Sequence, residues 1–245
     1  MLPAQPNQSL IDGLIVLQAL SEAAEPLGTT ELARRLGFEV TRVNRLLKTL
    51  AHLGLARQTN DRRYLIGPGI HALAAQALHA SGLLGRAFPH LQRLLSYGHT
   101  VALGVLWRDQ VSYLFHSGKD FTVAAGLRSR GVFPASRSSI GMVLLAGRSD
   151  AEVRALYAGR SDIERFGADI DALIAELAVV RNQGFARIDG RLHKGTDITM
   201  AVPVGRDGVA ALAFSGIYDK REEAKLLDVL REAATTIDGE EQGRA

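Results

Sequence analysis

Apolar residues in the first part of the chain recur every three or four positions. The pattern runs from Ser9 to Pro26, from Thr29 to Gly37 and from Val40 to Leu53, which predicts three helices. We expect Ser9 to cap the first helix and Thr29 or Thr30 to cap the second, because hydroxyl side chains satisfy free backbone N–H groups. A short helix, a tight turn with glycine and a second amphipathic helix form a helix-turn-helix.

The third of these helices has two contrasting faces. Its apolar face consists of Val43, Leu46, Leu47 and Leu50. Its polar face consists of Thr41, Asn44, Arg45, Lys48 and His52. Cationic and hydrogen-bonding groups on one face suit the reading of base edges and phosphates. An ordinary solvated helix carries similar residues, so the segment that follows decides between the two interpretations.

The segment after this helix has the pattern of a β-hairpin. Two short strands, Leu55–Gln58 and Arg63–Ile66, flank the polar turn Thr59–Arg62. A hairpin directly behind a recognition helix is a wing. Arginines 57, 62 and 63 on this wing are placed to meet phosphates or a minor groove, which favours a winged helix-turn-helix over a merely solvated helix.

The rest of the chain predicts a linker helix and then an α+β domain. Gly67-Pro68-Gly69 precedes the linker helix Ile70–Ala80. Further helices are expected at Phe88–Tyr97, Ser138–Ala146, Asp169–Asn182 and Asp219–Ile237. Another helix is expected to begin at a capping box formed by Ser149 and Glu152. Strands are expected at Thr100–Trp107, Gln110–His116, Phe121–Ala125, Ile198–Val204 and Val209–Ser215, paired largely in hairpins.

Charge is distributed unevenly along the 245 residues. The net charge is +3, yet Gly28–Gly67 holds eight Lys or Arg residues against three acids. Such a concentration is typical of nucleic-acid binding. The chain has no cysteine, no start typical of a signal peptide and no apolar run long enough to cross a bilayer, so we expect a cytoplasmic protein with no membrane partner.

Several stretches together resemble the IclR family of transcription regulators. In the first part they are Thr30–Gly37, Thr41–Leu50, Leu53–Leu55 and Arg63–Gly69. In the second part they are Pro134–Ala146, Gln183–Phe185, Gly195–Ile198, Val202–Val204 and Ala211–Gly216. Each motif is loose alone, but their order and spacing are specific, and the resemblance spans nearly the whole chain.

The resemblance implies a winged helix-turn-helix DNA-binding domain at 1–67, a linker helix at 68–82 and a GAF-like effector-binding domain at 83–240. It also implies assembly into homodimers or homotetramers, and binding to a pseudo-palindromic double-stranded DNA operator. Family members typically sense a small carboxylate or aromatic acid and control a catabolic operon. Repression and activation both remain open.

The sequence departs from the family pattern around the expected effector site. Ala135-Ser136-Arg137 stands where many members carry His-Ala-Thr, and Met142 replaces the usual lysine after the glycine. A Cys or Ser is missing near Ile198, and Ala213 replaces one of two serines, which leaves Ser215. The effector's identity therefore does not follow from the resemblance.

Specific residues are the candidates for each role. We expect base contacts from Asn44 and Arg45, and phosphate contacts from Arg42, Lys48, Arg57, Arg62 and Arg63, with Thr41 on the same surface. For the effector, the start of the helix capped near Ser138 is a ready anion site. The candidate effector residues are Ser136, Arg137, Ser138, Ser139, Asp189, Asp197 and Ser215. Trp107, Tyr113, Phe115 and Phe133 would add an apolar wall or, as strand aromatics do more often, fill the core.

Two other classes of protein are disfavoured by the sequence. An enzyme is disfavoured: Gly67–Ala72 fits a GxGxxA pattern only nominally, Gly118-Lys119 lacks the rest of a phosphate loop, and the seven histidines show no metal-ligand spacing. We therefore expect no cofactor and no metal. A ligand-responsive module whose winged helix binds protein rather than DNA is the alternative, and the local positive charge disfavours it.

Overall fold

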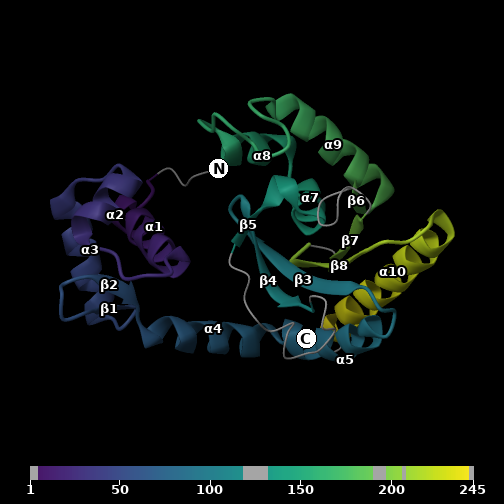
Figure 1. Cartoon of the computed structure of the whole chain (residues 1–245), viewed down its shortest axis with the longest axis horizontal. Coiled ribbons are helices and arrows are strands. Elements are labelled where there is room, and N and C mark those ends of the chain that lie inside the picture. Colours follow the sequence, from purple (N-terminus) through teal and green to yellow (C-terminus); the bar gives the residue numbers. More distant parts are fainter. Residues whose placement is uncertain (1–4, 118–131, 190–196, 206–207, 243–245) are drawn as a thin grey trace. The chain divides into compact units, whose positions relative to one another are not determined.

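The computed structural model describes residues 5–117, 132–189, 197–205 and 208–242 (Figure 1). The chain divides into two compact units, Met1–Gly82 and Leu83–Ala245. The strand expected at Phe121–Ala125 lies outside the described residues. Among the residues that are described, no helix is both long and apolar enough to cross a membrane.

The first unit is a winged helix-turn-helix. Its elements in order are α1 (Gln8–Glu22), α2 (Thr29–Leu36), α3 (Val40–His52), β1 (Ala56–Gln58), β2 (Tyr64–Ile66) and α4 (Pro68–Ser81). Apolar residues of the first three helices pack into one core that includes Val16, Leu32, Val43 and Leu47, all fully buried. The strands pair antiparallel, and Tyr64 also exchanges backbone hydrogen bonds with Leu27.

Two of the expected helix caps are wrong. The α1 helix starts before Ser9, because the Asn7 side chain accepts a hydrogen bond from the Leu10 N–H at 3.0 Å. The α2 helix starts at Thr29 with Gly28 at the cap position and no side-chain cap. Gly37 ends α2 with a φ of 66°, as expected for a glycine in the left-handed region.

The base of the wing is fixed by a close approach of backbones. The Gly67 N–H donates to the Leu55 carbonyl, and the Gly69 N–H donates to the Gly54 carbonyl, both at 2.9 Å. A Cβ atom on Gly67 would lie 2.3 Å from the Gly54 carbonyl oxygen. This position therefore requires glycine, which ties the end of the hairpin to the start of α4.

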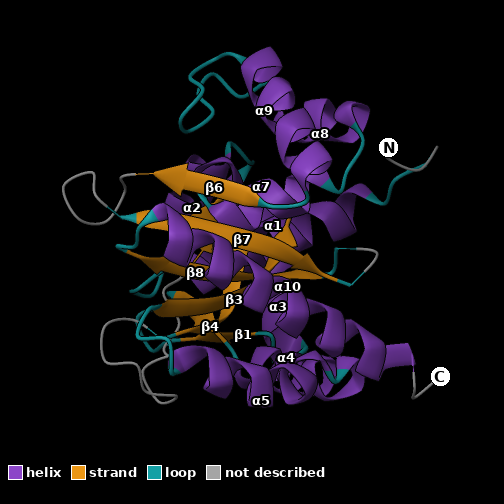
Figure 2. Cartoon of the chain, turned by 90° about the vertical axis from the view of Figure 1, so that its right-hand side faces the viewer, coloured by secondary structure: helices purple, strands orange, loops and turns teal. Residues whose placement is uncertain are grey.

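The second unit is built around a six-stranded antiparallel sheet with strand order β5-β4-β3-β8-β7-β6 (Figure 2). The strands are β3 (Thr100–Trp107), β4 (Gln110–His116), β5 (Val132–Pro134), β6 (Ala186–Asp189), β7 (Ile198–Val204) and β8 (Ala210–Gly216). The other elements are α5 (Leu83–Leu95), the short 3₁₀ turn η1 (Ala135–Arg137), α7 (Ser139–Ala146), α8 (Asp150–Tyr157), α9 (Ile170–Gln183) and α10 (Lys220–Gln242).

Helices cover both faces of this sheet. Successive residues of a strand point to opposite faces of the sheet. On one face Val101 and Leu103 pack in a core with α5 and α10, and on the other face Ala102 packs in a second core with α7, α8 and α9. The face towards α7 carries small residues, including Gly104, Ala211 and Ala213. Small residues let α7 approach closely, and all eight of its residues are buried.

The helices and hairpins of this unit agree with the sequence in part. The β3–β4 and β7–β8 hairpins and the Ser149–Glu152 capping box are confirmed. The helix expected from Phe88 is α5, which begins at Leu83 and contains Pro89. The short strands β5 and β6 were not predicted, although the four residues of β6 alternate between buried and exposed positions.

Candidate nucleic-acid interface and ligand pocket

The α3 helix presents the polar face that the sequence predicts. Thr41, Arg45 and Lys48 are exposed and Asn44 is half-buried. On the opposite face Val43, Leu47 and Leu50 are buried and Leu46 is half-buried. Neither Arg45 nor Lys48 has an ion-pair partner among the described residues. Both cations are therefore available to an external anion.

Arg42 differs from its neighbours on α3 because it already has a partner. Its guanidinium group forms an ion pair with the buried carboxylate of Asp12 on α1. The same group lies over the ring of Phe38, 5.6 Å from the ring centroid. Arg42 is thus anchored within the unit, with its side chain 45% exposed.

The wing carries the three predicted arginines. Arg57 and Arg62 are exposed and have no ion pair in the described part of the chain. Arg62 adopts a φ of 63°, an unusual backbone conformation for a residue other than glycine, at the tip of the hairpin. Arg63 donates to the Pro26 carbonyl at 3.1 Å and pairs with Asp61 at 3.5 Å, so it is less free than the other two.

The tip of the wing is ordered by a small hydrogen-bond network. The Thr59 hydroxyl donates to the Asp61 carboxylate and accepts from the Arg63 N–H at 3.1 Å. The hydrogen bond from Thr59 lowers the pKa of Asp61. The turn is therefore ordered without an external partner.

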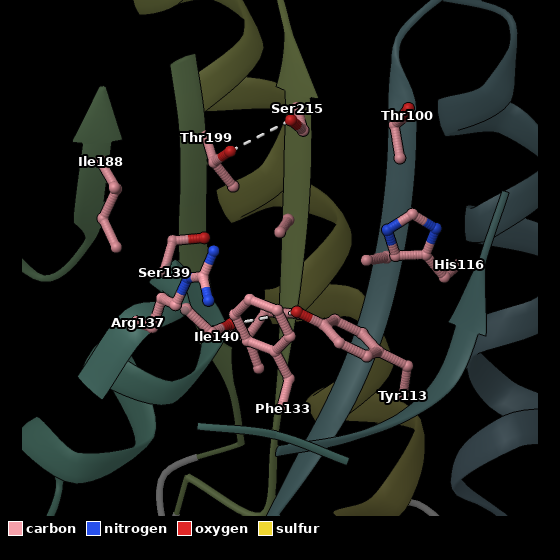
Figure 3. A pocket seen from close by; sticks show the side chains of 13 residues that line it. Thr100, Tyr113, His116, Phe133, Arg137, Ser139, Ile140, Ile188, Thr199 and Ser215 are labelled. Carbon is pink, nitrogen blue, oxygen red and sulfur yellow. Dashed lines mark hydrogen bonds between the residues drawn. The ribbon is translucent and has the colours of Figure 1, made fainter. Parts of the chain in front are cut away.

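A cavity of about 160 Å³ lies in the second unit, between the sheet and the start of α7 (Figure 3). An engineered protein cavity of similar volume binds one benzene molecule. Its lining combines an apolar floor with polar groups at its ends. The lining residues are Thr100, Ala102, Tyr113, His116, Phe133, Arg137, Ser138, Ser139, Ile140, Ile188, Thr199, Ala213 and Ser215.

Three hydroxyl groups cross one end of the cavity in a row (Figure 3). They belong to Thr100, Ser215 and Thr199, which are register partners across β3, β8 and β7. The Thr199 hydroxyl donates to the Ser215 hydroxyl at 3.0 Å. This arrangement places hydrogen-bonding groups opposite the α7 end of the cavity.

An irregularity in β4 shapes a second wall. The pairing of β3 with β4 shifts by one residue between Leu103 and Gly104. The extra residue brings Tyr113 and His116 to the same face, although residues three apart on a regular strand point to opposite faces. Their rings are 5.3 Å apart in an edge-to-face arrangement, and both line the cavity.

The start of α7 supplies the polar groups of the other end. Ser138 occupies the cap position but makes no side-chain cap hydrogen bond, and its hydroxyl instead lies 3.2 Å from the Tyr113 hydroxyl. Ser139 is 2% exposed, and its Oγ has no hydrogen-bond partner among the described residues. A buried hydroxyl without a partner, beside free helix N–H groups, favours a bound polar ligand.

Arg137 stands at the edge of the cavity. Its guanidinium lies over the Phe133 ring, 5.3 Å from the centroid, and donates to Glu164 at 3.1 Å. Ser136 lies on the same turn but lines a separate cavity with Tyr157. Burial, together with the charge of Asp109, raises the pKa of Tyr157 to about 12.

The two candidate carboxylates do not line the cavity. Asp189 ends β6 with its side chain 60% exposed and pairs with Arg187. Asp197 is buried at the start of β7, outside the set of lining residues. The structure thus brings together Arg137, Ser138, Ser139 and Ser215, and separates Ser136 and both aspartates from them.

Several lining residues were missed from the sequence. Thr100 and Thr199 had a detectable signal, because each is a polar residue on the same strand face as small buried neighbours. His116 had none, since the shift in β4 alone turns it into the cavity. Of the strand aromatics, Tyr113 and Phe133 line the cavity, Phe115 is buried in the other core, and Trp107 is exposed.

Two family models match the chain. The IclR helix-turn-helix domain matches residues 9–60, and the bacterial transcriptional regulator IclR C-terminal domain matches residues 75–239. Among curated relatives, the Pca regulon regulatory protein of Pseudomonas putida is 31% identical over 80% of this chain and 68% of its own length. The regulator KdgR of Escherichia coli is 31% identical over 82% of this chain and 78% of its own.

Solved structures have the same fold. An IclR transcriptional regulator from Silicibacter sp. TM1040 has a TM-score of 0.78 at 24% identity, covering 95% of this chain and 96% of the other. An IclR homologue from Microbacterium hydrocarbonoxydans, solved with 4-hydroxybenzoate, has a TM-score of 0.65 at 21% identity, covering 96% and 99%. These relatives are transcription regulators rather than enzymes, and the chain belongs to the IclR family of DNA-binding transcriptional regulators.

Proposed function

We propose that the protein binds a pseudo-palindromic operator through α3 and the wing, and that a small carboxylate or aromatic acid in the cavity controls this binding. The main support for this DNA interface is a set of exposed cations on α3 and the wing that have no ion pair with any described residue: Arg45, Lys48, Arg57 and Arg62. Asn44 and Arg45 read bases, while the other cations bind phosphates. Thr41 and Arg63 flank this surface.

Two substitutions on α3 separate the two kinds of contact. Arg45→Ala is expected to relax specificity by about 1–3 kcal/mol, because a base contact is lost. Lys48→Ala is expected to weaken binding to all sequences alike and to reduce the salt dependence. Fluorescence anisotropy with labelled DNA from upstream of the gene, and with a shuffled duplex, measures both effects. An equal loss on both duplexes for Arg45→Ala contradicts the assignment of Arg45 to a base.

Self-association is part of the proposal. The α4 helix has no buried residue, and its Leu73 is 53% exposed. On α1, Leu10 and Leu14 are 62% and 45% exposed. Exposed apolar side chains on two helices of one unit support a homodimer, or a homotetramer built from such dimers. A two-fold dimer matches half-sites about 10 bp apart.

The buried hydroxyl of Ser139 supports ligand binding in the cavity. A carboxylate at the start of α7 accepts hydrogen bonds from this hydroxyl and from backbone N–H groups, with Arg137 nearby. The cavity volume of about 160 Å³ suits a single ring or a short chain. The ligand acts by a population shift, changing through α4 how the two winged helices of a dimer match their half-sites.

Replacing Ser139 by alanine is expected to lower ligand affinity without lowering stability. Affinity for a trial acid, 4-hydroxybenzoate or benzoate, is expected to fall by roughly threefold to tenfold, because one hydrogen bond is lost. The ligand-free protein is expected to keep its stability or gain slightly, since a buried hydroxyl without a partner is removed. Isothermal titration calorimetry and thermal unfolding measure the two quantities.

Ser215→Ala is the control for the stability measurement, because this hydroxyl already bonds Thr199. Its removal is expected to lower stability, since Thr199 loses its partner. A Ser139→Ala protein that binds the trial acid as tightly as the unaltered protein does would remove Ser139 from the site.

A further inference from the structure

Asp12 has a buried carboxyl group that has no role in the DNA interface described above. Asp12 lies on α1, not on the recognition helix, and its side chain is only 2% exposed. A carboxylate this buried costs several kcal/mol unless charged or hydrogen-bonding partners compensate for the loss of water. Its partners therefore show what it does in the fold.

Two side chains contact the buried carboxylate of Asp12. Gln8, one turn earlier on α1, donates to Oδ1 at 2.8 Å. The guanidinium group of Arg42, the third residue of α3, forms an ion pair with Oδ2. The ion pair thus joins α1 to the first turn of the recognition helix.

Arg42 also contacts the segment that leads into α3. Its guanidinium lies over the Phe38 ring, 5.6 Å from the centroid, just before α3 begins. In helix-turn-helix proteins the first residues of the recognition helix are those that contact base edges. A contact that fixes this turn against α1 therefore fixes the part of α3 that reads DNA.

We propose that Asp12 and Arg42 are positioning residues: the pair holds the first turn of α3 against α1, and Arg42 contributes no net charge to phosphate binding. This differs from the role that the sequence suggested for Arg42, a direct phosphate contact. The pair is neutral as a whole, so it releases no counterions from DNA. Lys48 on the same helix has no such partner among the described residues and serves as the comparison.

The test uses the whole chain and variants that replace a charged side chain by an uncharged polar one: Asp12→Asn, Arg42→Gln, the double variant, and Lys48→Gln as the matched control. Binding is measured by anisotropy on a labelled duplex from upstream of the gene and on a shuffled duplex, across a salt series. Circular dichroism checks that each variant is folded. The double variant has no unpaired buried charge, so it remains informative even where a single variant fails to fold.

The expected result has three parts. Asp12→Asn and Arg42→Gln each weaken binding to the upstream duplex by about fivefold to twentyfold, and the double variant is no weaker than the weaker single variant. The slope of log affinity against log salt is unchanged for Arg42→Gln and for the double variant. Lys48→Gln instead reduces the magnitude of this slope by about 0.9.

The sign of the Asp12→Asn effect separates positioning from simple electrostatics. Removal of a negative charge from a DNA-binding domain would by itself tighten binding to DNA, whereas loss of positioning weakens it. Tighter binding by Asp12→Asn overturns the proposal, as does a slope for Arg42→Gln or the double variant that falls as it does for Lys48→Gln. If the unaltered protein binds neither duplex at any salt, the DNA interface itself fails, and this proposal fails with it.

Discussion

Replacing Gly141 by alanine is expected to destabilise the second unit by about 3 kcal/mol and to abolish binding in the cavity. A Cβ atom at this position would lie 2.2 Å from the Ala135 carbonyl oxygen and 2.4 Å from the Ala135 Cα. These are backbone atoms of the turn η1, which packs directly on α7. The turn must shift to make room, and it carries Arg137 at the edge of the cavity.

Chemical unfolding followed by tryptophan fluorescence measures this effect. The chain has one tryptophan, Trp107, which lies on β3 in the same unit. Gly85→Ala is the matched control, because Gly85 is helical and a Cβ there meets nothing within 4 Å. That variant is expected to gain about 0.5–1 kcal/mol. Identical unfolding of Gly141→Ala and the unaltered protein would show that the turn and α7 are not closely packed.

Replacing Leu47 by alanine is expected to lower the stability of the first unit by about 2–5 kcal/mol, and with it the affinity for DNA. Leu47 lies on the core-facing side of α3 and is fully buried. Its removal leaves a cavity beneath the helix that carries the DNA-contacting residues. Unfolding followed by far-UV circular dichroism, together with anisotropy on labelled DNA, measures both losses.

Leu53→Ala is the control for this substitution. Leu53 caps the same helix at its C-terminal end and is 61% exposed. The same change of side chain at an exposed position is expected to alter stability by no more than about 0.5 kcal/mol. Equal effects at the two positions would be incompatible with the packing of α3 that the structure describes.

The DNA-binding unit could be predicted largely from the sequence, because its signals are local. The apolar spacing of α3 and the polar turn of the wing each depend on residues close together in the chain. The predicted caps of α1 and α2 were wrong, because Asn7 and Gly28 lie next to hydroxyl residues that could also occupy the cap position. The spacing of apolar residues alone does not decide between such neighbours. The role of Arg42 was less accessible, since its partner Asp12 is 30 residues away.

The cavity could be predicted only in part. The serines at the start of α7 were found because they precede a buried helix. The row of hydroxyls depends on the register between β3, β8 and β7, which alternation within one strand does not determine. The position of His116 in the cavity depends on the register shift in β4. Asp189 and Asp197 were expected at the cavity because of their place in the sequence, but sequence position alone does not determine where a side chain points.

The α4 helix has a consequence for how the protein folds. It spans Pro68–Ser81 and buries none of its side chains within the single chain. An isolated helix of this length is marginal in water, and most helices depend on packing for their stability. We therefore expect helical structure in this segment to depend, by mass action, on the proposed association with a second chain, so that ellipticity in dilute solution rises with protein concentration.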